Sequence, residues 1–500
     1  MRDSWTHLVV GAGSAGATVA ARLSQNPSNR VLLLEAGPDY RSAETPATVS
    51  NPNNWQLRGA GTHTWPGLTA HVTRDQGLTP YEQGRGVGGS SAVNNTFALR
   101  ALPSDIERWA RSGLNSLEWD ELLNLYRSSE CDIDFAGEDC HGSNGPLAVS
   151  RPTDGDWGPV DSAFREAAID IGYPWCADLN APGVSGVGPV PMTVRDAKRV
   201  STNDAYLEPA RERANLVVLG DACVTQVLFD GKRATGVAAS RHGAELLERS
   251  EKIILCAGAI HTPVLLCRSG VGPASVLRNI GIDPLTDLPV GRNLTEHPLL
   301  AALLPFSDAG AFGPGYEGRQ GCFLLRTGSS GAGTDLNLVA FNVTPLPGLG
   351  TMFVALMGPT SRGNVRLLDR DNFSVSFDSL STQADLEALG SGVELLRTLL
   401  ATSPVTGVSP APFDVTGRPF DPPSDRDELA SWMRERCVPY FHAAGTCRMG
   451  DDDDSVVDGQ FRVRGIDNLY VVDASVFPDA TSANTNLTVI ALAERAAAML

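Results

Sequence analysis

The chain has 500 residues, of which 42% are hydrophobic and 20% charged, a composition typical of a globular protein with two domains or two large lobes. Its formal net charge of −18 argues against a nucleic acid or an anionic membrane as partner, because like charges repel. Nine cysteines without a C-x-x-C pair favour reduced thiols over disulfides or a metal site. We therefore expect a soluble, cytoplasmic protein with no membrane span and no bound metal.

The first forty residues follow the order strand, glycine turn, helix, strand. Continuous apolar runs at 8–10 and 31–34 predict parallel strands covered on both faces. Between them, a turn over 11–16 leads into small residues with helical spacing at 15–23. This order is that of a nucleotide-binding βαβ unit.

Later segments predict two interleaved lobes. The expected elements are an ordered loop over 51–83, helices over 104–127, 203–213 and 263–267, hairpin strands at 216–219 and 222–229, buried strands at 253–255 and 469–472, and a terminal helix over 486–500. Short alternating runs within 300–430, such as 337–343 and 375–377, predict an antiparallel lobe. The expected fold is α/β (α+β overall), with a dinucleotide-binding domain from 1–150, 195–299 and 431–500 and a second domain from 151–194 and 300–430.

The turn Gly11-Ala12-Gly13-Ser14-Ala15-Gly16 has the G-x-G-x-x-G pattern of a dinucleotide site. Its glycines allow a tight turn and close approach of a pyrophosphate to a helix N-terminus. Glu35 ends the next strand at about the 20-residue offset expected for an acid that holds ribose hydroxyls. That acid favours NAD or FAD over NADP, and a glycine turn without a ligand is the alternative.

A second glycine-rich segment, 84–91, separates these two cofactors. Its sequence, G-R-G-V-G-G-S-S, provides a backbone path with little side-chain bulk that can lie along a pyrophosphate or a planar ring. A simple NAD domain has no need of it. Taken alone, the segment is equally compatible with a surface turn.

Two polar residues near the C-terminus are candidates for the chemistry. His442 lies between apolar residues and a glycine turn, a setting that also suits a packed core histidine. Asn484 directly precedes the terminal helix, where an asparagine can instead cap the helix or form a turn. These residues by themselves leave both interpretations open.

Six ordered motifs together carry a resemblance to a known family. They are G-A-G-S-A-G with E-A-G at 35–37, G-R-G-V-G-G-S-S-A-V-N at 84–94, G-A-I-H-T-P-V-L-L-C-R-S-G-V-G-P at 258–273, V-G-R-N-L-T-E-H-P at 290–298, H-A-A-G-T-C-R-M-G at 442–450 and V-D-A-S-V-F-P-D-A-T-S-A-N-T-N at 472–486. From about residue 6 to its end, the chain resembles the glucose–methanol–choline (GMC) oxidoreductases. The resemblance implies a Rossmann-like FAD domain with a parallel sheet and a substrate lobe with an antiparallel sheet.

The resemblance also implies roles for individual residues. His442 would take the hydroxyl proton of an alcohol while a hydride passes to the flavin, and Asn484 would bind the substrate oxygen. A histidine suits proton transfer near neutral pH because its unperturbed pKa is about 6.5. The implied cofactor contacts are Gly11, Gly13, Ser14, Ala15, Gly16, Glu35, Ala36, Trp65, Arg85, Val87, Gly88, Gly89, Asn94, Asn95, Thr96, Phe97, Val224, Phe441, Asp473, Ala474, Asn484 and Thr485. Val93 stands where some members attach FAD through a histidine, so we expect non-covalent FAD.

Several functions fit this resemblance. The phrases Y-E-Q-G-R at 81–85 and A-N-T-N-L at 483–487 are closest to bacterial furfuryl and aryl alcohol oxidases, which reduce oxygen, and to the flavoprotein of the mycofactocin system, which would oxidise a redox cofactor for respiration. A hydroxynitrile lyase-like member without net redox change, a nicotinamide-dependent dehydrogenase and a non-catalytic flavin-binding protein are the alternatives. The expected partners are a small alcohol and oxygen or another electron acceptor; the sequence leaves the substrate and the oligomeric state open.

Overall fold

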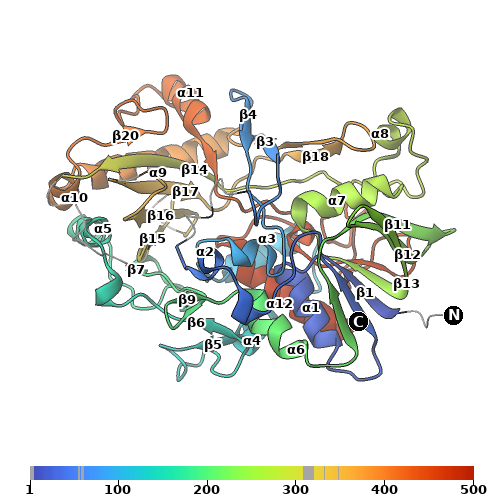
Figure 1. Cartoon of the computed structure of the whole chain (residues 1–500). Coiled ribbons are helices and arrows are strands. Elements are labelled where there is room, and N and C mark those ends of the chain that lie inside the picture. Colours follow the sequence, from blue (N-terminus) through green and yellow to red (C-terminus); the bar gives the residue numbers. More distant parts are fainter. Residues whose placement is uncertain (1–4, 54–56, 58–60, 308–319, 331–332, 347) are drawn as a thin grey trace.

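The structure of the chain is a computed structural model that describes residues 5–53, 57, 61–307, 320–330, 333–346 and 348–500 (Figure 1). Two seven-stranded sheets lie at opposite ends of the molecule, with helices packed against each of them (Figure 1). Among the helices of the described ranges, none combines the length and the apolar character that a membrane crossing needs.

The first sheet joins strands from the start, middle and end of the chain. Its parallel part has the order β10 (Leu216–Leu219), β2 (Val31–Leu34), β1 (Trp5–Val10), β13 (Ala244–Leu255) and β22 (Leu469–Val471). The antiparallel strands β12 (Arg233–Arg241) and β11 (Ala222–Asp230) continue it beyond the first half of β13. Every residue of β2 is buried, as the continuous apolar run predicts for a parallel strand covered on both faces.

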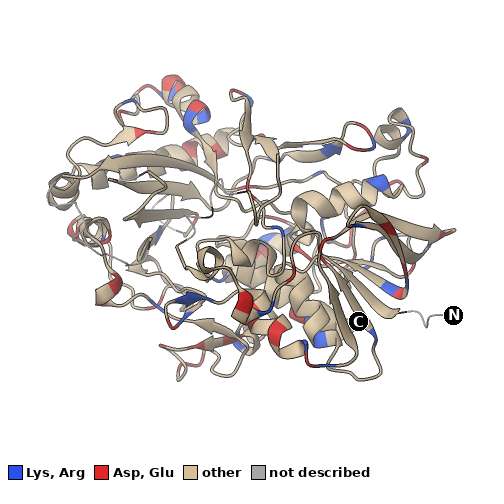
Figure 2. Cartoon of the chain, viewed as in Figure 1, with Lys and Arg blue, Asp and Glu red and all other residues tan. Residues whose placement is uncertain are grey.

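The second sheet is antiparallel throughout. Its strands are β20 (Phe413–Asp414), β14 (Pro298–Pro305), β17 (Leu349–Leu356), β16 (Leu336–Phe341), β15 (Phe323–Thr327) and β7 (Gly186–Pro189), with β21 (Val438–Pro439) beside β14. In Figure 2 these strands are mostly tan, whereas charged residues gather on the peripheral helices and loops. The expected fold class is therefore confirmed: a mixed, largely parallel sheet in one lobe and an antiparallel sheet in the other.

Smaller elements complete the molecule. The helices are α1 (Ser14–Leu23), α2 (Ala47–Ser50), α3 (Pro103–Arg111), α4 (Trp119–Ser129), α5 (Pro159–Asp170), α6 (Glu208–Ala210), α7 (Gly258–Arg268), α8 (Ala274–Asn279), α9 (Gln383–Leu400), α10 (Ser403–Val408), α11 (Arg426–Arg436) and α12 (Thr485–Met499). The remaining strands form a four-stranded sheet, β18 (Asn364–Leu367), β19 (Phe373–Ser376), β3 (Thr69–His71) and β4 (Leu78–Pro80), and two ribbons, β5 (Glu130–Asp132) with β6 (Leu147–Val149) and β8 (Val194–Arg195) with β9 (Lys198–Arg199).

Four local expectations were wrong. The helix predicted over 104–127 is two helices, because the chain turns at Gly113, whose φ is +94°. The helix predicted over 203–213 is a π-helical turn at Asn203–Leu207 followed by the short α6. Strand β10 pairs in parallel with β2, so the hairpin partner of β11 is β12. The loop predicted over 51–83 contains β3 and β4, which pair with each other, and β3 also pairs with β19, the strand predicted at 375–377.

Candidate active site

A cavity of about 930 Å³ extends from the edge of the parallel sheet to one face of the antiparallel sheet. Eighteen of the predicted site residues line it: Gly11, Gly13, Ser14, Ala15, Glu35, Ala36, Trp65, Gly89, Asn94, Asn95, Phe97, Val224, Phe441, His442, Asp473, Ala474, Asn484 and Thr485. The structure thus brings segments from five distant parts of the sequence around one space. The cavity is large enough for a dinucleotide together with a small substrate.

The other five predicted residues, Gly16, Arg85, Val87, Gly88 and Thr96, lie outside this lining. They shape the backbone behind it. A Cβ on Gly16 would overlap the carbonyl oxygen of Gly11, so this glycine packs helix against turn. Arg85 donates a hydrogen bond to the carbonyl of Ala36 at 2.7 Å. Thr96 has a positive φ of 62° that bends the chain after Asn94.

The two glycine-rich segments touch each other. Gly89 has a φ of +50°, and a Cβ on it would lie 2.5 Å from the Cα of Gly13. The Glu35 carboxylate joins the segments by accepting backbone hydrogen bonds from Ala12 at 2.7 Å and from Gly86 at 2.9 Å. It also accepts from Gly37 at 2.8 Å, which leaves about one of its four lone pairs for a ribose hydroxyl.

Two helices begin at the cavity. The N-terminal residues of α1 and α12 line it, and Ser14 of the first donates to the Asn486 Oδ1 of the second at 2.6 Å. Helix N-termini attract anions, and backbone without Cβ atoms at Gly11 and Gly13 leaves room for close approach. The two helix N-termini and the glycines fit a diphosphate-linked dinucleotide. The apolar face of the antiparallel sheet remains available for a second molecule in the same cavity.

His442 and Asn484 face each other in this cavity. The Nδ2 of Asn484 lies 3.1 Å from the Nε2 of His442, although the two residues are 42 positions apart. Asn484 occupies the N-cap position of α12, but its side chain makes no capping hydrogen bond. The side chain of Asn484 therefore points toward His442 and does not cap helix α12. Burial, followed by the neighbouring His297, lowers the pKa of His442 well below its usual value, which keeps the ring neutral.

A second histidine fixes the tautomer of the first. The Nδ1 atoms of His297 and His442 are 2.8 Å apart, so one of them donates to the other. Because the Asn484 amide donates to Nε2 of His442, that nitrogen carries a lone pair and the proton is on Nδ1. His442 therefore donates to His297, which keeps its own proton on Nε2. Interactions with the backbone of Thr481 and Met357 favour that proton, although Nε2 makes no hydrogen bond to a described residue.

A buried carboxyl group holds the backbone beneath both histidines. Glu296 accepts hydrogen bonds from the backbone N–H of His297 at 2.8 Å and of His442 at 2.9 Å. The Tyr81 hydroxyl donates to it at 2.7 Å and accepts from the Ala443 N–H at 3.1 Å. Burial raises the pKa of Glu296 to about 7 against the opposing effect of these hydrogen bonds. The segment directly before β14 and the loop after β21 are thereby fixed to each other.

Glu296, His297 and His442 lie close enough together to resemble a metal site. Two nitrogens bound to one tetrahedral metal at 2.0–2.1 Å would be about 3.3 Å apart. The observed 2.8 Å is a hydrogen-bond distance. The arrangement is that of a proton-transfer pair.

Sequence reasoning missed four residues of this site. Glu296 and His297 lie within the 290–298 motif, and Tyr81 lies within the 81–85 phrase, so their position was visible but their role was not. Tyr440 is the fourth: its ring lies 4.4 Å from that of His442, and its buried hydroxyl interacts with the side chain of Asn484. Each of these roles depends on contacts between segments that are far apart in the sequence.

One cavity contains both a dinucleotide-binding region, formed by the two glycine-rich segments, and a neutral, hydrogen-bonded histidine, His442. This combination is typical of an oxidoreductase that uses a redox nucleotide. Models of the GMC oxidoreductase family match residues 5–299 and 359–493, and the chain belongs to this family. It is an oxidoreductase that acts on CH–OH donors, with FAD as its cofactor.

Relatives extend over nearly the whole chain. It is 33% identical to an oxygen-dependent choline dehydrogenase of Ectopseudomonas mendocina (strain ymp), over 99% of this chain and 94% of the relative. It is also 33% identical to a 5-(hydroxymethyl)furfural oxidase of Methylovorus sp. (strain MP688), over 98% and 97% of the two chains. A solved structure of pyridoxine 4-oxidase from Mesorbium loti is 29% identical, with a TM-score of 0.90 and 99% of both chains covered.

Proposed function

We propose that the protein oxidises small, uncharged alcohols with an apolar body to the aldehyde or ketone, with His442 as the base. Bound FAD supplies the acceptor for the carbon-bound hydride. The attachment of FAD is non-covalent, since Val93 lacks a nucleophilic side chain. Electrons then pass to oxygen or to another acceptor. The observation that carries this proposal is the neutral Nε2 of His442 facing the Asn484 amide in a cavity shared with the glycine segments.

The hydrogen bonds of His442 suit it to take a proton from an alcohol. Its Nε2 lone pair faces the cavity side on which Asn484 lies, and its Nδ1 proton is held by His297 at 2.8 Å. An alcohol oxygen between the two side chains donates its proton to Nε2 and accepts a hydrogen bond from the Asn484 amide. Loss of that proton gives the oxygen alkoxide character, which weakens the adjacent C–H bond toward hydride loss.

The substrate end of the cavity supports an apolar alcohol. Alternate residues of β14, β16 and β17 point into it from one sheet face: Leu299, Ala301, Leu303, Phe341, Thr351 and Phe353. Among the described residues at this end, none carries a charge. The carboxylates that do line the cavity, Glu35, Glu82, Asp371 and Asp473, come from other segments. A quaternary ammonium group would have no counter-ion on this face, whereas an aromatic or furan ring would pack against it.

Substitution of the proposed base tests the proposal. His442→Ala should retain FAD, as measured by absorbance after gel filtration, because none of the glycine contacts depends on the imidazole. It should lose alcohol-dependent bleaching of the flavin by about 10²–10⁴-fold, the range for general base catalysis. Bleaching at the wild-type rate would overturn the assignment of the base. If the wild type is bleached by choline and by no benzylic or furfuryl alcohol, the proposed substrate class is wrong.

A further inference from the structure

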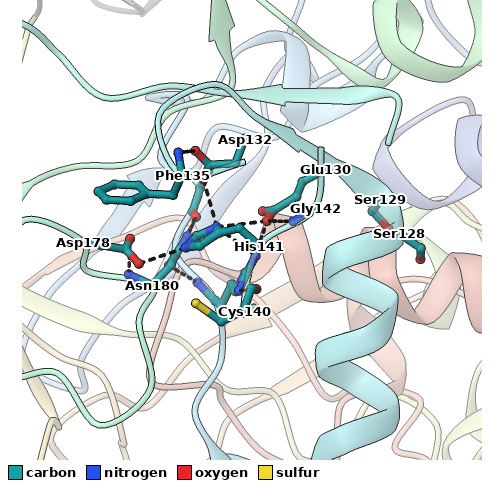
Figure 3. A network of polar contacts seen from close by, with 12 residues as sticks. Ser128, Ser129, Glu130, Asp132, Phe135, Cys140, His141, Gly142, Asp178 and Asn180 are labelled. Atoms are coloured by element: carbon teal, nitrogen blue, oxygen red, sulfur yellow. Dashed lines mark hydrogen bonds and ion pairs between the residues drawn. The ribbon is translucent and has the colours of Figure 1, made fainter. Parts of the chain in front are cut away.

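A buried group of ionisable side chains lies outside the lining of the main cavity (Figure 3). We name it the His141 cluster; its members are Arg100, Glu130, Asp132, His141, Arg151 and Asp178. No side chain in it is more than 10% exposed. It joins strand β5, the loops on either side of β6 and the loop before β7, and Figure 3 shows His141 at its centre between Glu130 and Asp178.

Both ring nitrogens of His141 face carboxylates. Nδ1 lies 3.1 Å from Glu130 Oε1 and 3.0 Å from Asp132 Oδ2, and Nε2 lies 2.9 Å from Asp178 Oδ2. Ionised carboxylates only accept hydrogen bonds, and a neutral imidazole donates from one nitrogen alone. Two donors are needed here, so His141 is an imidazolium. No tautomer of the neutral ring would satisfy this geometry.

The charges of the cluster balance only with this proton in place. Arg100 pairs with Glu130, and Arg151 pairs with Asp132 at 2.5 Å and with Asp178 at 2.8 Å. Three carboxylates against two guanidinium groups leave one negative charge in the cluster, which His141 cancels. At the edge of the cluster, the partly exposed Asp134, 3.8 Å from Arg151, and the buried Arg326, which interacts with Asp178, add one charge of each sign. Burial alone lowers the pKa of His141, but its hydrogen bonds to the three carboxylates outweigh burial and raise the pKa to about 11. Glu130, Asp132 and His141 lie close enough together to resemble a metal site, but guanidinium nitrogens of Arg100 and Arg151 already bind the two carboxylates.

The cluster is connected to the segment that lines the cofactor cavity. Asn180 accepts from the backbone N–H of Arg100 at 3.0 Å and donates to the carbonyl of Ala98 at 2.8 Å. Its own backbone N–H donates to Asp178, the carboxylate that holds Nε2 of His141. The Arg100 guanidinium also binds the carbonyl of Cys140 at 2.7 Å, beside His141. Residues 98–100 are thus held by hydrogen bonds to the backbone of Ala98 and Arg100 and to the side chain of Arg100.

We propose that His141 is a positioning residue that holds the segment 94–100 against the cofactor as a permanent cation. Asn94, Asn95 and Phe97 of this segment line the cavity, and Phe97 is only three residues from Arg100. Without the imidazolium, the uncompensated carboxylates repel each other and the segment loses its anchor. The inference rests on FAD binding by this segment and is independent of which alcohol is oxidised.

The test compares two substitutions in the full-length protein. His141→Gln removes the charge, and Asp385→Asn is the control, since Asp385 is equally buried and accepts backbone hydrogen bonds from Thr360 and Ser361, which lie outside the cavity lining. We expect His141→Gln to raise the Kd for FAD on the order of tenfold, the loss of one hydrogen bond to a charged group, and to change the visible circular dichroism of the bound flavin. Asp385→Asn should lower the Tm without either change. Equal FAD affinity and an unchanged flavin spectrum in both variants would overturn the positioning role.

Charge balance is tested by a second substitution. Adding Asp178→Asn to His141→Gln restores two carboxylates against two guanidinium groups, and we expect it to recover part of the FAD affinity. If the double variant binds FAD more weakly than His141→Gln, the charge argument is wrong. Should His141→Gln fail to fold, ¹⁵N NMR of ring-labelled histidine in the wild-type holoenzyme decides at pH 8: the account requires one imidazolium signal, and neutral rings alone would refute it.

Discussion

Replacement of His297 by leucine tests whether a second histidine controls the first. Leucine has similar volume and no acceptor, so the 2.8 Å hydrogen bond from Nδ1 of His442 is lost and its ring is free to adopt the other tautomer. A donor left buried without its acceptor costs about 1–3 kcal/mol. If the reactive tautomer of His442 bears that cost, kcat drops roughly 5- to 150-fold. The backbone N–H of residue 297, which donates to Glu296, is unchanged by the substitution.

The assay is kcat and KM for a benzylic alcohol in the FAD-loaded enzyme, with His297→Asn as the matched control. The asparagine Oδ1 takes the place of the histidine Nδ1 and still accepts from His442, so most of kcat should return. KM should change little in either variant, because His297 does not line the cavity. A leucine variant within twofold of wild-type kcat, or an asparagine variant as slow as leucine, would refute this reasoning.

Three further predictions concern the cofactor and stability. Gly89→Ala should give protein without FAD, since the new Cβ would lie 2.5 Å from the Gly13 Cα; a yellow protein of normal flavin content would contradict the close approach of the two segments. Acid precipitation of the wild type should release all flavin into the supernatant, because the side chain of Val93 has no nucleophile that could bond to FAD; flavin retained in the pellet would show covalent attachment. His141, whose folded pKa of about 11 exceeds the unfolded value of about 6.5, stabilises the fold fully below pH 6.5, and this contribution is lost as pH rises toward 11. The free energy of unfolding should therefore fall more steeply from pH 7 to 10 in wild type than in His141→Gln, by about 1.4 kcal/mol per pH unit, and parallel curves would exclude the bound proton.

The layers of the fold could be predicted because they follow from local hydrophobic pattern. Continuous apolar runs gave the parallel strands β1 and β2, and alternating runs gave β16 in the antiparallel sheet. Pairing was harder. Strand β10 directly precedes β11 in the sequence, which predicts that the two form a hairpin. In the structure, β10 instead pairs with β2, which lies nearly two hundred positions earlier. The hydrophobic pattern of a strand indicates which of its faces is buried, but it does not indicate which other strand pairs with it.

The sequence predicted those residues of the site that lie in recognisable motifs, but not the contacts between them. His442 and Asn484 were each compatible with a structural role, and only the fold brings them to 3.1 Å. The contribution of His297 depends on a hydrogen bond between residues 145 positions apart, and no spacing in the sequence encodes it. The His141 cluster joins segments between residues 100 and 178 that share no motif, so its charge balance becomes visible only when the side chains are placed.

Anaerobic titration of the FAD-loaded enzyme with benzylic and furfuryl alcohols tests the central claim most directly. The account predicts that these alcohols bleach the visible absorbance of the oxidised flavin, because the substrate hydride reduces it. It also predicts that His442→Ala with full FAD content is not bleached on the same time scale. Restoration of the absorbance on admission of air would identify oxygen as the acceptor, and persistent bleaching would identify another. An enzyme with bound FAD that no uncharged alcohol bleaches would contradict the account.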